Sequence, residues 1–312
     1  MTLIQLEYIV AVDNFRHFAK AADSCFVTQP TLSMQIQKLE DQLGVIIFDR
    51  NMHPVEPTKV GKKIIEQARV AIRESKRIDE IINEEKEELV GELNLGIIPT
   101  LSPYLLPLFI NDFINENPAV KIKVQELTSE QLLIQLKNDT IDLGIMVTPI
   151  GDDSIIEKPI FYEEFMGYMN HRHTLYNKET LSVEDVQYND LWILNEGHCF
   201  RNQVLNICQP SLKQKSKRNF VFESGSLEGL RKIVDHHGGM TLLPELATLD
   251  MTNSEKAKLK RFNDPRPIRE VSIVMKKSFL KRKMVEVLHK NISKAIPGYI
   301  HSEKNGNVIK WK

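Results

Sequence analysis

The sequence predicts an α/β protein in which a small helical domain and one long helix precede a larger domain of alternating strands and helices. In residues 1 to about 58, apolar side chains recur at spacings of three and four, which is the period of an amphipathic helix. From Gly91 onward, short β-rich runs alternate with helical segments, a pattern typical of parallel β-α-β units. The length of 312 residues, with 42% hydrophobic and 27% charged residues, agrees with a globular chain of about two domains.

Charge and hydropathy exclude several classes of protein. The chain has 41 Lys and Arg against 42 Asp and Glu, so any attraction to nucleic acid must come from a local surface. No run approaches the roughly 18 apolar residues of a membrane span, and the first residues lack a basic signal-peptide start. Three cysteines are too few for a secreted disulfide framework. We therefore expect a cytoplasmic protein with no membrane partner.

A long helix is predicted over residues 59–90, because this stretch contains no proline and carries a narrow apolar seam. The seam consists of Ile64, Ala68, Ala71, Ser75, Ile78, Ile82 and Leu89. Such a seam on an otherwise charged helix favours pairing with a second copy of the same helix, and hence at least a dimer. The alternative is a helix packed on its own domain.

The larger domain, residues 91–312, is predicted to form two α/β lobes. Strands are expected near Glu92–Ile98, Val120–Glu126 and Ile141–Val147, with helices over residues 102–118 and 129–139 between them. A second series of strands and helices covers about 160–244 and includes the runs LWILNEG and NFVFES. A strand at 271–277 and a helix at 281–296 close the chain. We assign about 91–162 and 267–300 to lobe I and about 163–266 to lobe II. The basic tail from Lys276 to Lys312 is interpreted as a solvated helix face plus a frayed terminus, rather than a nucleic-acid-binding arm.

The helical domain, residues 1–58, contains a candidate helix-turn-helix. Thr28 can cap a helix that tolerates Pro30 in its first turn, after a short turn through Cys25. Cys25 has no basic neighbour and is interpreted as structural. The second helix is expected to bury Leu32, Ile36, Leu39 and Leu43, which leaves Gln29, Thr31, Ser33, Met34, Gln37 and Lys38 facing outward. A polar face near a helix N-terminus can reach phosphates and base edges in a major groove, whereas a generic two-helix corner would have no such role.

The run FAKAADSCFVTQPTLSMQIQKLEDQLGVIIFDR, followed by PTKVGKKI, resembles the winged helix-turn-helix of LysR-type transcriptional regulators. The resemblance implies a linker helix and a two-lobed, periplasmic-binding-protein-like regulatory domain. It implies major-groove contacts from Gln29, Pro30, Thr31 and Ser33, and a minor-groove wing over about residues 51–57 that includes His53. Met34 and Gln37 stand where the family often has basic residues, and His53 stands where it often has Arg.

Two cysteines at the ends of the run GHCFRNQVLNIC form a candidate redox pair. His198 and Arg201 flank Cys199, and a nearby cation or a helix N-terminus favours the thiolate, the form that reacts with peroxide. Cys208 follows nine residues later, which places it about 13 Å away along a continuous helix. A disulfide needs a Cα separation of about 4.4 to 6.8 Å, so this helix would have to unwind. The alternative is two unrelated, inert core thiols.

The segment NEGHCFRNQVLNIC, with GSLEGLRKIVDHHGGMTLLPEL downstream, is similar to the sensor of the hydrogen-peroxide-responsive members of the LysR-type family. The resemblance implies that Cys199 reacts with peroxide and that Cys208 resolves the product as a disulfide. It further implies a peroxide pocket formed by His198, Arg201, Thr100, Ser129, Arg266 and, as a further donor, Gln203. Ser129 stands where the family commonly has Thr, and Asn202 replaces its usual Asp.

The resemblance implies a transcription activator of oxidative-stress genes that binds promoter DNA as a homotetramer, a dimer of dimers, and works with RNA polymerase. We expect no enzymatic activity, no cofactor and no metal, since His236 and His237 have no third ligand at a recognisable spacing. Two alternatives remain open. The regulator could respond to a small organic effector in the cleft between the lobes, or the thiol pair could belong to a peroxidase or thiol oxidoreductase.

Overall fold

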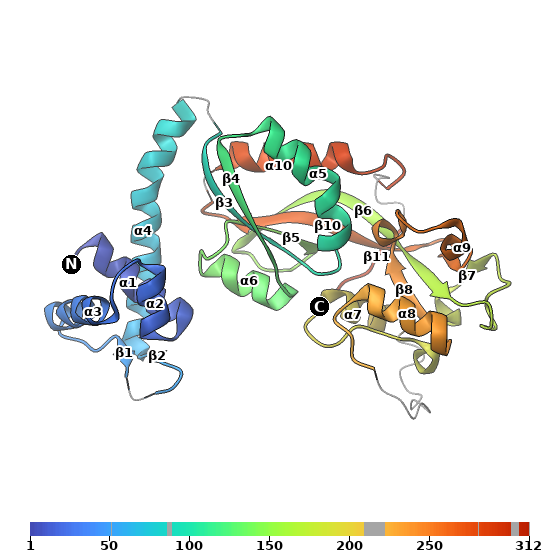
Figure 1. Ribbon diagram of the computed structural model, residues 1–312, viewed down its shortest axis with the longest axis horizontal. Helices are drawn as coiled ribbons and strands as arrows, with labels where there is room; N and C mark the ends of the chain where they lie inside the picture. Colours follow the sequence, from blue (N-terminus) through green and yellow to red (C-terminus); the bar gives the residue numbers. More distant parts are fainter. Residues whose placement is uncertain (51, 86–88, 209–221, 280, 301–305, 312) are drawn as a thin grey trace. The chain divides into compact units, whose positions relative to one another are not determined.

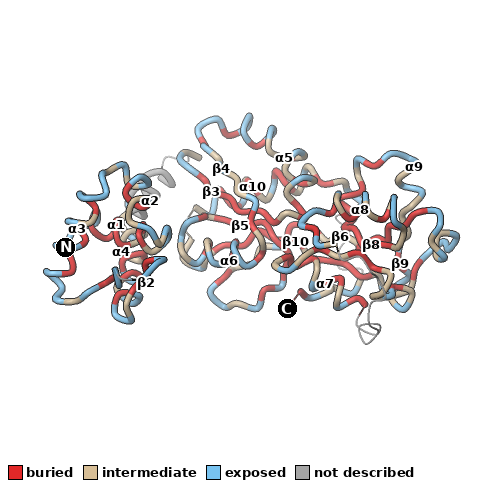
Figure 2. The backbone as a smooth tube through the Cα atoms, turned by 60° about the horizontal axis from the view of Figure 1, so that its bottom comes forward, coloured by how far each residue is buried: buried red, intermediate tan, exposed pale blue. Residues whose placement is uncertain are grey.

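The computed structural model describes residues 1–50, 52–85, 89–208, 222–279, 281–300 and 306–311 (Figure 1). The chain forms two compact units, one containing the N-terminal helices and the long helix, the other beginning at Leu89. Buried residues follow the strands and the inner faces of the helices in each unit (Figure 2). No helix in the described part of the chain combines the length and hydropathy that a membrane-spanning segment requires.

The first unit has the predicted helix-turn-helix with a two-stranded wing. Its elements are α1 (Leu3–Phe15), α2 (Phe18–Ser24), α3 (Gln29–Leu43), the antiparallel pair β1 (Phe48–Asp49) and β2 (Glu56–Pro57), and α4 (Lys59–Glu85). The Thr28 hydroxyl accepts a hydrogen bond from the backbone N–H of Thr31 and caps α3, as the sequence predicts. Leu32, Ile36 and Leu39 are buried as predicted. The prediction for Leu43 is wrong, because the last turn of α3 runs past the core and leaves this side chain 38% exposed.

Glu40 fixes the start of the wing to α3. One carboxylate oxygen accepts hydrogen bonds from the backbone N–H groups of Ile47 (2.7 Å) and Phe48 (3.2 Å). The other oxygen accepts from the Arg50 guanidinium at 3.0 Å. Since the Glu40 side chain is only 10% exposed, these bonds satisfy backbone groups that water reaches poorly.

The first turns of helix α4 follow the alternative interpretation, a helix packed on its own domain, and pairing with a second copy stays a prediction. Ile65 and Ala68 are buried in the helix-turn-helix core, so the first turns of α4 pack on their own domain. Ile78 lies further along the helix and is 62% exposed. The prediction that Leu89 belongs to the seam is wrong, because α4 ends at Glu85 and Leu89 packs against the core of the next domain.

Lobe I has the predicted parallel β-α-β units. Its strands are β3 (Gly91–Ile97), β4 (Val120–Glu126) and β5 (Leu143–Thr148), and its helices are α5 (Ser102–Glu116), α6 (Ser129–Lys137) and α10 (Arg282–Ala295). Strand β3 lies between β4 and β5 and is parallel to both. Helices α5 and α10 cover one face of this sheet and α6 the other (Figure 1).

Two long strands join lobe I to lobe II. Strand β6 (Ile155–Met169) pairs antiparallel with β10 (Pro267–Lys276), and β10 also pairs antiparallel with β5. In lobe II, β6 continues beside β8 (Met240–Pro244) and β9 (Leu259–Phe262), and β9 pairs with β7 (Thr180–Leu181). Helices α7 (Cys199–Ile207), α8 (Leu227–His237) and α9 (Asn253–Lys256) complete the lobe.

Three sequence predictions for the second unit need correction or restriction. The run LWILNEG forms no strand and makes only isolated bridges, at Leu191 and Leu194. The run NFVFES lies partly outside the described residues, as do positions 280, 301–305 and 312 of the predicted tail. The prediction of a frayed terminus is wrong for residues 306–311, because β11 (Asn307–Val308) pairs parallel with β10 and Trp311 is buried.

Replacing Glu40 with Ala is expected to lower the free energy of unfolding by about 2–4 kcal/mol, since two buried N–H groups lose their acceptor. Chemical denaturation checks this, with Glu66→Ala at an exposed position of α4 as the control. Glu40→Gln, which keeps one acceptor oxygen, should lie between the wild type and Glu40→Ala. Equal stability of Glu40→Ala and the control would show that the wing does not depend on this carboxylate.

Candidate functional site

The two cysteines of α7 lie in different hydrophobic cores. Cys199, the first residue of the helix, is 3% exposed and belongs to the core of lobe I. Cys208, directly after the helix, is fully buried in the core of lobe II together with Phe200 and Val204. Both are thiols. Helix α7 therefore lies at the junction of the lobes, with one thiol anchored on each side.

The continuous helix keeps the thiols apart, as the spacing predicts. Nine residues separate Cys199 from Cys208, which corresponds to about 13 Å along a helix axis. The Cys208 thiol donates to the carbonyl of Leu205 at 3.5 Å. A disulfide between these two cysteines requires α7 to unwind.

The surroundings of Cys199 act on the pKa of its thiol in opposite directions. Burial raises the pKa of the Cys199 thiol, while the Ser129 hydroxyl, the Arg269 charge and backbone N–H groups at the start of α7 oppose this. The net direction is upward. The prediction that the flanking residues favour the thiolate is thus wrong for this state of the protein, because desolvation outweighs the favourable contacts.

The charge that acts on Cys199 is that of Arg269, whereas His198 and Arg201 interact with other groups. His198 caps α7 and is 8% exposed, and burial lowers the pKa of its imidazole despite the opposing charge of Glu126. The Arg201 guanidinium donates to the carbonyl of Leu194 at 2.8 Å. Both residues shape the turn that leads into α7.

Arg269, in the middle of β10, is the basic residue beside Cys199. It is fully buried and forms an ion pair with the equally buried Glu163 of β6, at 2.7 Å. It donates to the side-chain oxygen of Thr100 at 3.1 Å and lies over the ring of Phe200 at 5.3 Å. Arg266 instead pairs with Glu164 and Asp264, so the prediction that Arg266 is the basic residue near Cys199 is wrong.

The sequence contains a pattern that indicates a buried, paired charge at Arg269. Arg269 and Glu270 interrupt an apolar strand-like run, and a charge within a buried strand requires a partner. Its partner, Glu163, lies more than a hundred residues earlier in the chain, so spacing does not connect the two.

Two of the predicted pocket residues carry buried oxygens with unused hydrogen-bonding capacity. Among the described residues, Gln203 Oε1 has no hydrogen-bond partner, and Ser129 Oγ has none apart from the adjacent Cys199 sulfur. Ser129 is 1% exposed and lies against Cys199, so its hydroxyl can donate to that sulfur. Gln203 donates its amide N–H to the carbonyl of Ile309 at 2.6 Å and faces the C-terminal segment. The structure thus places Ser129 beside Cys199 and Thr100 beside Arg269, whereas Arg201, Gln203 and Arg266 bond elsewhere.

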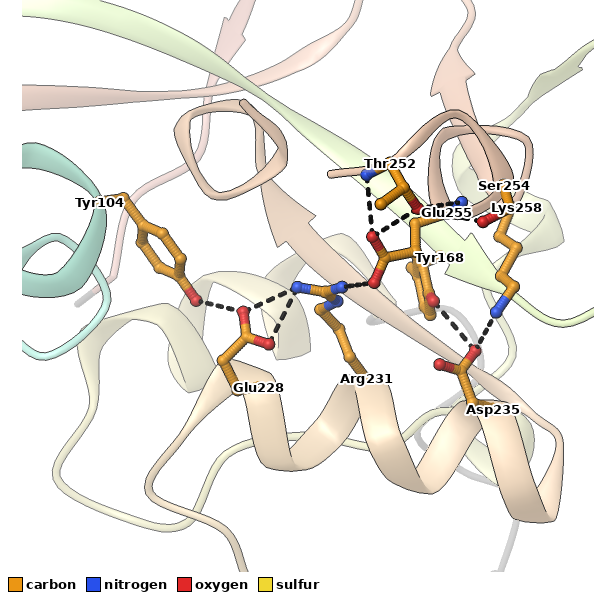
Figure 3. A network of polar contacts seen from close by, with 9 residues as sticks. All are labelled: Tyr104, Tyr168, Glu228, Arg231, Asp235, Thr252, Ser254, Glu255 and Lys258. Carbon is orange, nitrogen blue, oxygen red and sulfur yellow. Dashed lines mark hydrogen bonds and ion pairs between the residues drawn. The ribbon is translucent and has the colours of Figure 1, made fainter. Parts of the chain in front are cut away.

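A polar network links the lobes near α8 (Figure 3). The Tyr104 hydroxyl of α5 donates to Glu228 of α8 at 3.2 Å, and Glu228 accepts from Arg231 at 2.8 Å. Arg231 also pairs with Glu255. Burial raises the pKa of Tyr104, so this hydroxyl remains a donor at neutral pH. The network ties lobe I to lobe II independently of α7.

The predicted DNA-binding residues form one exposed surface on α3, with His53 exposed in the loop between β1 and β2. The exposed residues of α3 are Gln29, Pro30, Thr31, Met34, Gln37 and Lys38, and Ser33 is half-buried among them. Phe26, in the turn that the sequence predicts before α3, is 96% exposed. Its backbone has a φ of 56°, in the left-handed region. Asn51, at the start of the predicted wing, lies outside the described residues.

Comparison with known proteins gives matches along almost the whole chain. Residues 3–62 match the family of bacterial regulatory helix-turn-helix proteins of the lysR family, and residues 86–295 match the LysR substrate binding domain. A hydrogen peroxide-inducible genes activator of Haemophilus influenzae is 36% identical, over 88% of this chain and 90% of that protein. The DNA-binding transcriptional dual regulator OxyR of Escherichia coli is 34% identical, over 96% and 97%.

Solved structures match in the same way. A full-length OxyR variant from Pseudomonas aeruginosa aligns with a TM-score of 0.77 and 34% identity, and covers 94% of this chain and 98% of that one. An OxyR mutant from Corynebacterium glutamicum, described as H2O2-bound, aligns with a TM-score of 0.62 and 26% identity, over 94% and 92%.

Oxidation of Cys199 by hydrogen peroxide is expected to speed up about tenfold per pH unit between pH 7 and 9. The raised pKa leaves the thiol protonated in this range, so the thiolate fraction grows with pH. Ser129→Ala should raise the pKa further and slow oxidation at pH 7, whereas Ser254→Ala at an exposed position should not. Mass spectrometry after thiol blocking gives the rates. A rate that no longer changes above pH 7 would contradict the assigned direction.

Proposed function

The chain belongs to the LysR family of bacterial transcriptional regulators, and on that basis we propose that it senses hydrogen peroxide through Cys199 and activates oxidative-stress genes. The observation that carries the proposal is that one continuous helix bears a buried thiol at each end, in the cores of different lobes. The names of the relatives, peroxide-inducible activators and OxyR proteins, support the same signal. The helix-turn-helix supports promoter DNA as the partner.

The proposed reaction oxidises two thiols and reduces one peroxide. The Cys199 thiolate attacks a peroxide oxygen, the O–O bond breaks, and the sulfur becomes a sulfenic acid. The other oxygen leaves as hydroxide and takes up a proton to become water. The Cys208 sulfur then attacks the sulfenic sulfur, and a second water leaves as the disulfide forms. Two thiols and one peroxide thus give one disulfide and two waters.

The polar groups around Cys199 fit the first of these steps. The departing oxygen carries negative charge, and preorganised donors stabilise such charge in a site that excludes water. Ser129 offers a hydroxyl with no other hydrogen-bond partner among the described residues. Arg269, held by Glu163 and Thr100, adds a fixed positive charge. We infer that these residues hold the peroxide against Cys199.

Disulfide formation would change the shape of the regulatory domain. Because α7 packs on both cores, its unwinding alters lobe II and the contacts between the lobes. We infer that subunits then pair differently and that their DNA-binding domains change spacing on the operator. A homotetramer in the cytoplasm, working with RNA polymerase and without enzymatic turnover, is part of this proposal. The exposed Ile78 of α4 offers one surface for self-association.

Replacing Cys199 with Ser should abolish the peroxide response and leave DNA binding intact, because α7 lies in a different compact unit from the recognition helix α3. Peptide mapping after a near-stoichiometric dose of peroxide should give a Cys199–Cys208 linkage with Cys25 free. Cys25→Ser is the matched control and should respond like the wild type. Two reduced thiols in treated wild-type protein would instead favour an organic effector, and repeated peroxide turnover with a thiol reductant would favour an enzyme.

Replacing Ser33 with Glu should weaken operator binding by at least about tenfold in both redox states, since an added carboxylate on this face repels DNA phosphates. Ser254→Glu, on an exposed segment of lobe II, is the control and should bind normally. Electrophoretic mobility shift at fixed salt measures both. Unchanged affinity of the Ser33 variant would remove this residue from the DNA interface.

A further inference from the structure

The C-terminal residues 306–311, which we name the C-terminal strap, lie along the first residues of β10. The backbone N–H of Asn307 donates to the carbonyl of Arg266 at 2.8 Å, and that of Ile309 donates to the carbonyl of Ile268 at 2.9 Å. A Cβ added at Gly306 would lie 2.6 Å from the Arg266 carbonyl oxygen, so the strap approaches β10 more closely than other residues allow. The strap is therefore an extra strand at the point where the chain returns from lobe II to lobe I.

Helix α7 holds the other side of the strap through three side-chain amides. Asn202 donates to the carbonyl of Trp311 (3.1 Å), Gln203 to that of Ile309 (2.6 Å) and Asn206 to that of Lys310 (2.8 Å). Three successive strap carbonyls thus accept from a single helix. The three amides stand at positions i, i+1 and i+4, which share one face only while the segment is helical.

The strap also contacts both hydrophobic cores. Trp311 is 4% exposed and belongs to the core of lobe I, whereas Ile309 packs against the core of lobe II. The strap thus contacts the same two cores that contain the two thiols of α7, Cys199 in lobe I and Cys208 in lobe II.

We propose that the C-terminal strap is a latch that keeps α7 helical in the reduced protein and is released when Cys199 and Cys208 form a disulfide. This inference rests on the proposed function. Closing the disulfide brings the two Cα atoms from about 13 Å to within about 7 Å, so the helical turns between them must open. The three amides then leave their common face and cannot reach three successive carbonyls. Because these hydrogen bonds exist only in the reduced state, they oppose oxidation.

The strap takes no part in the covalent chemistry, which remains the reduction of peroxide to two waters by the thiol pair. Asn202, Gln203 and Asn206 are positioning residues. They act on the equilibrium and the rate of disulfide closure through the helix that bears both cysteines. A merely structural role would change the stability of the protein without changing its redox behaviour.

The first test compares two variants of the full chain. Asn202 and Asn206 are exposed, so the double variant N202A/N206A removes two latch bonds without opening a cavity. We expect its disulfide equilibrium constant, titrated against a thiol–disulfide buffer, to rise about tenfold, and peroxide-driven closure to accelerate. Lys310→Ala is the matched control, because the strap bonds through the Lys310 carbonyl and not its side chain. Equal constants in the double variant and the control would overturn the latch.

The second test follows the strap directly. The chain has two tryptophans, Trp192 and Trp311, so Trp192→Phe leaves Trp311 as the only indole reporter. Peroxide should shift its emission to the red as Trp311 leaves the core, and adding Cys208→Ser should abolish the shift. Emission that stays unchanged while the wild-type disulfide forms would overturn the latch and leave the proposed function standing. Absence of any Cys199–Cys208 disulfide in the wild type would overturn both.

Discussion

The buried ion pair between Arg269 and Glu163 is the interaction on which the regulatory domain depends. The two side chains lie on β10 and β6, the strands that run between the lobes, and neither is exposed to solvent. Glu163 also accepts from the backbone of Leu246, and Arg269 binds Thr100 and covers Phe200 of α7. Both charges are thereby compensated, which is what makes a buried pair tolerable. Loss of one partner from such a pair typically costs about 3–5 kcal/mol.

The ion pair between Arg269 and Glu163 also affects the ionisation of the buried Cys199. Burial favours the neutral thiol of Cys199, and the nearby charge of Arg269 partly offsets this. A more exposed site would ionise more readily but would also admit larger oxidants and reductants. A buried site excludes larger oxidants and reductants, and its desolvation lowers the thiolate fraction.

Local patterns in the sequence predict the parts of this protein that depend on neighbouring residues. The strands β3, β4 and β5, the cap at Thr28 and the continuous helix between Cys199 and Cys208 all follow from spacing and residue type. Spacing does not predict contacts between residues that are far apart in the sequence. Arg269 finds Glu163 over 106 positions, and Asn202 reaches Trp311 over 109. The basic composition of the tail predicts a solvated end. The burial of Trp311 does not follow from composition, because it depends on a surface made by other segments.

The antiparallel ribbon of β6 and β10 also decides which motions the lobes can make. A flexible linker would let them swing apart, whereas a hydrogen-bonded ribbon resists stretching and shear and yields most easily to torsion. Its pairing register shifts between Val271 and Ser272, an irregularity of the kind that locally increases strand twist. A rearrangement in lobe II would therefore reach lobe I along this ribbon, as a small rotation about the ribbon axis. Such a rotation turns the surfaces of one lobe relative to those of the other.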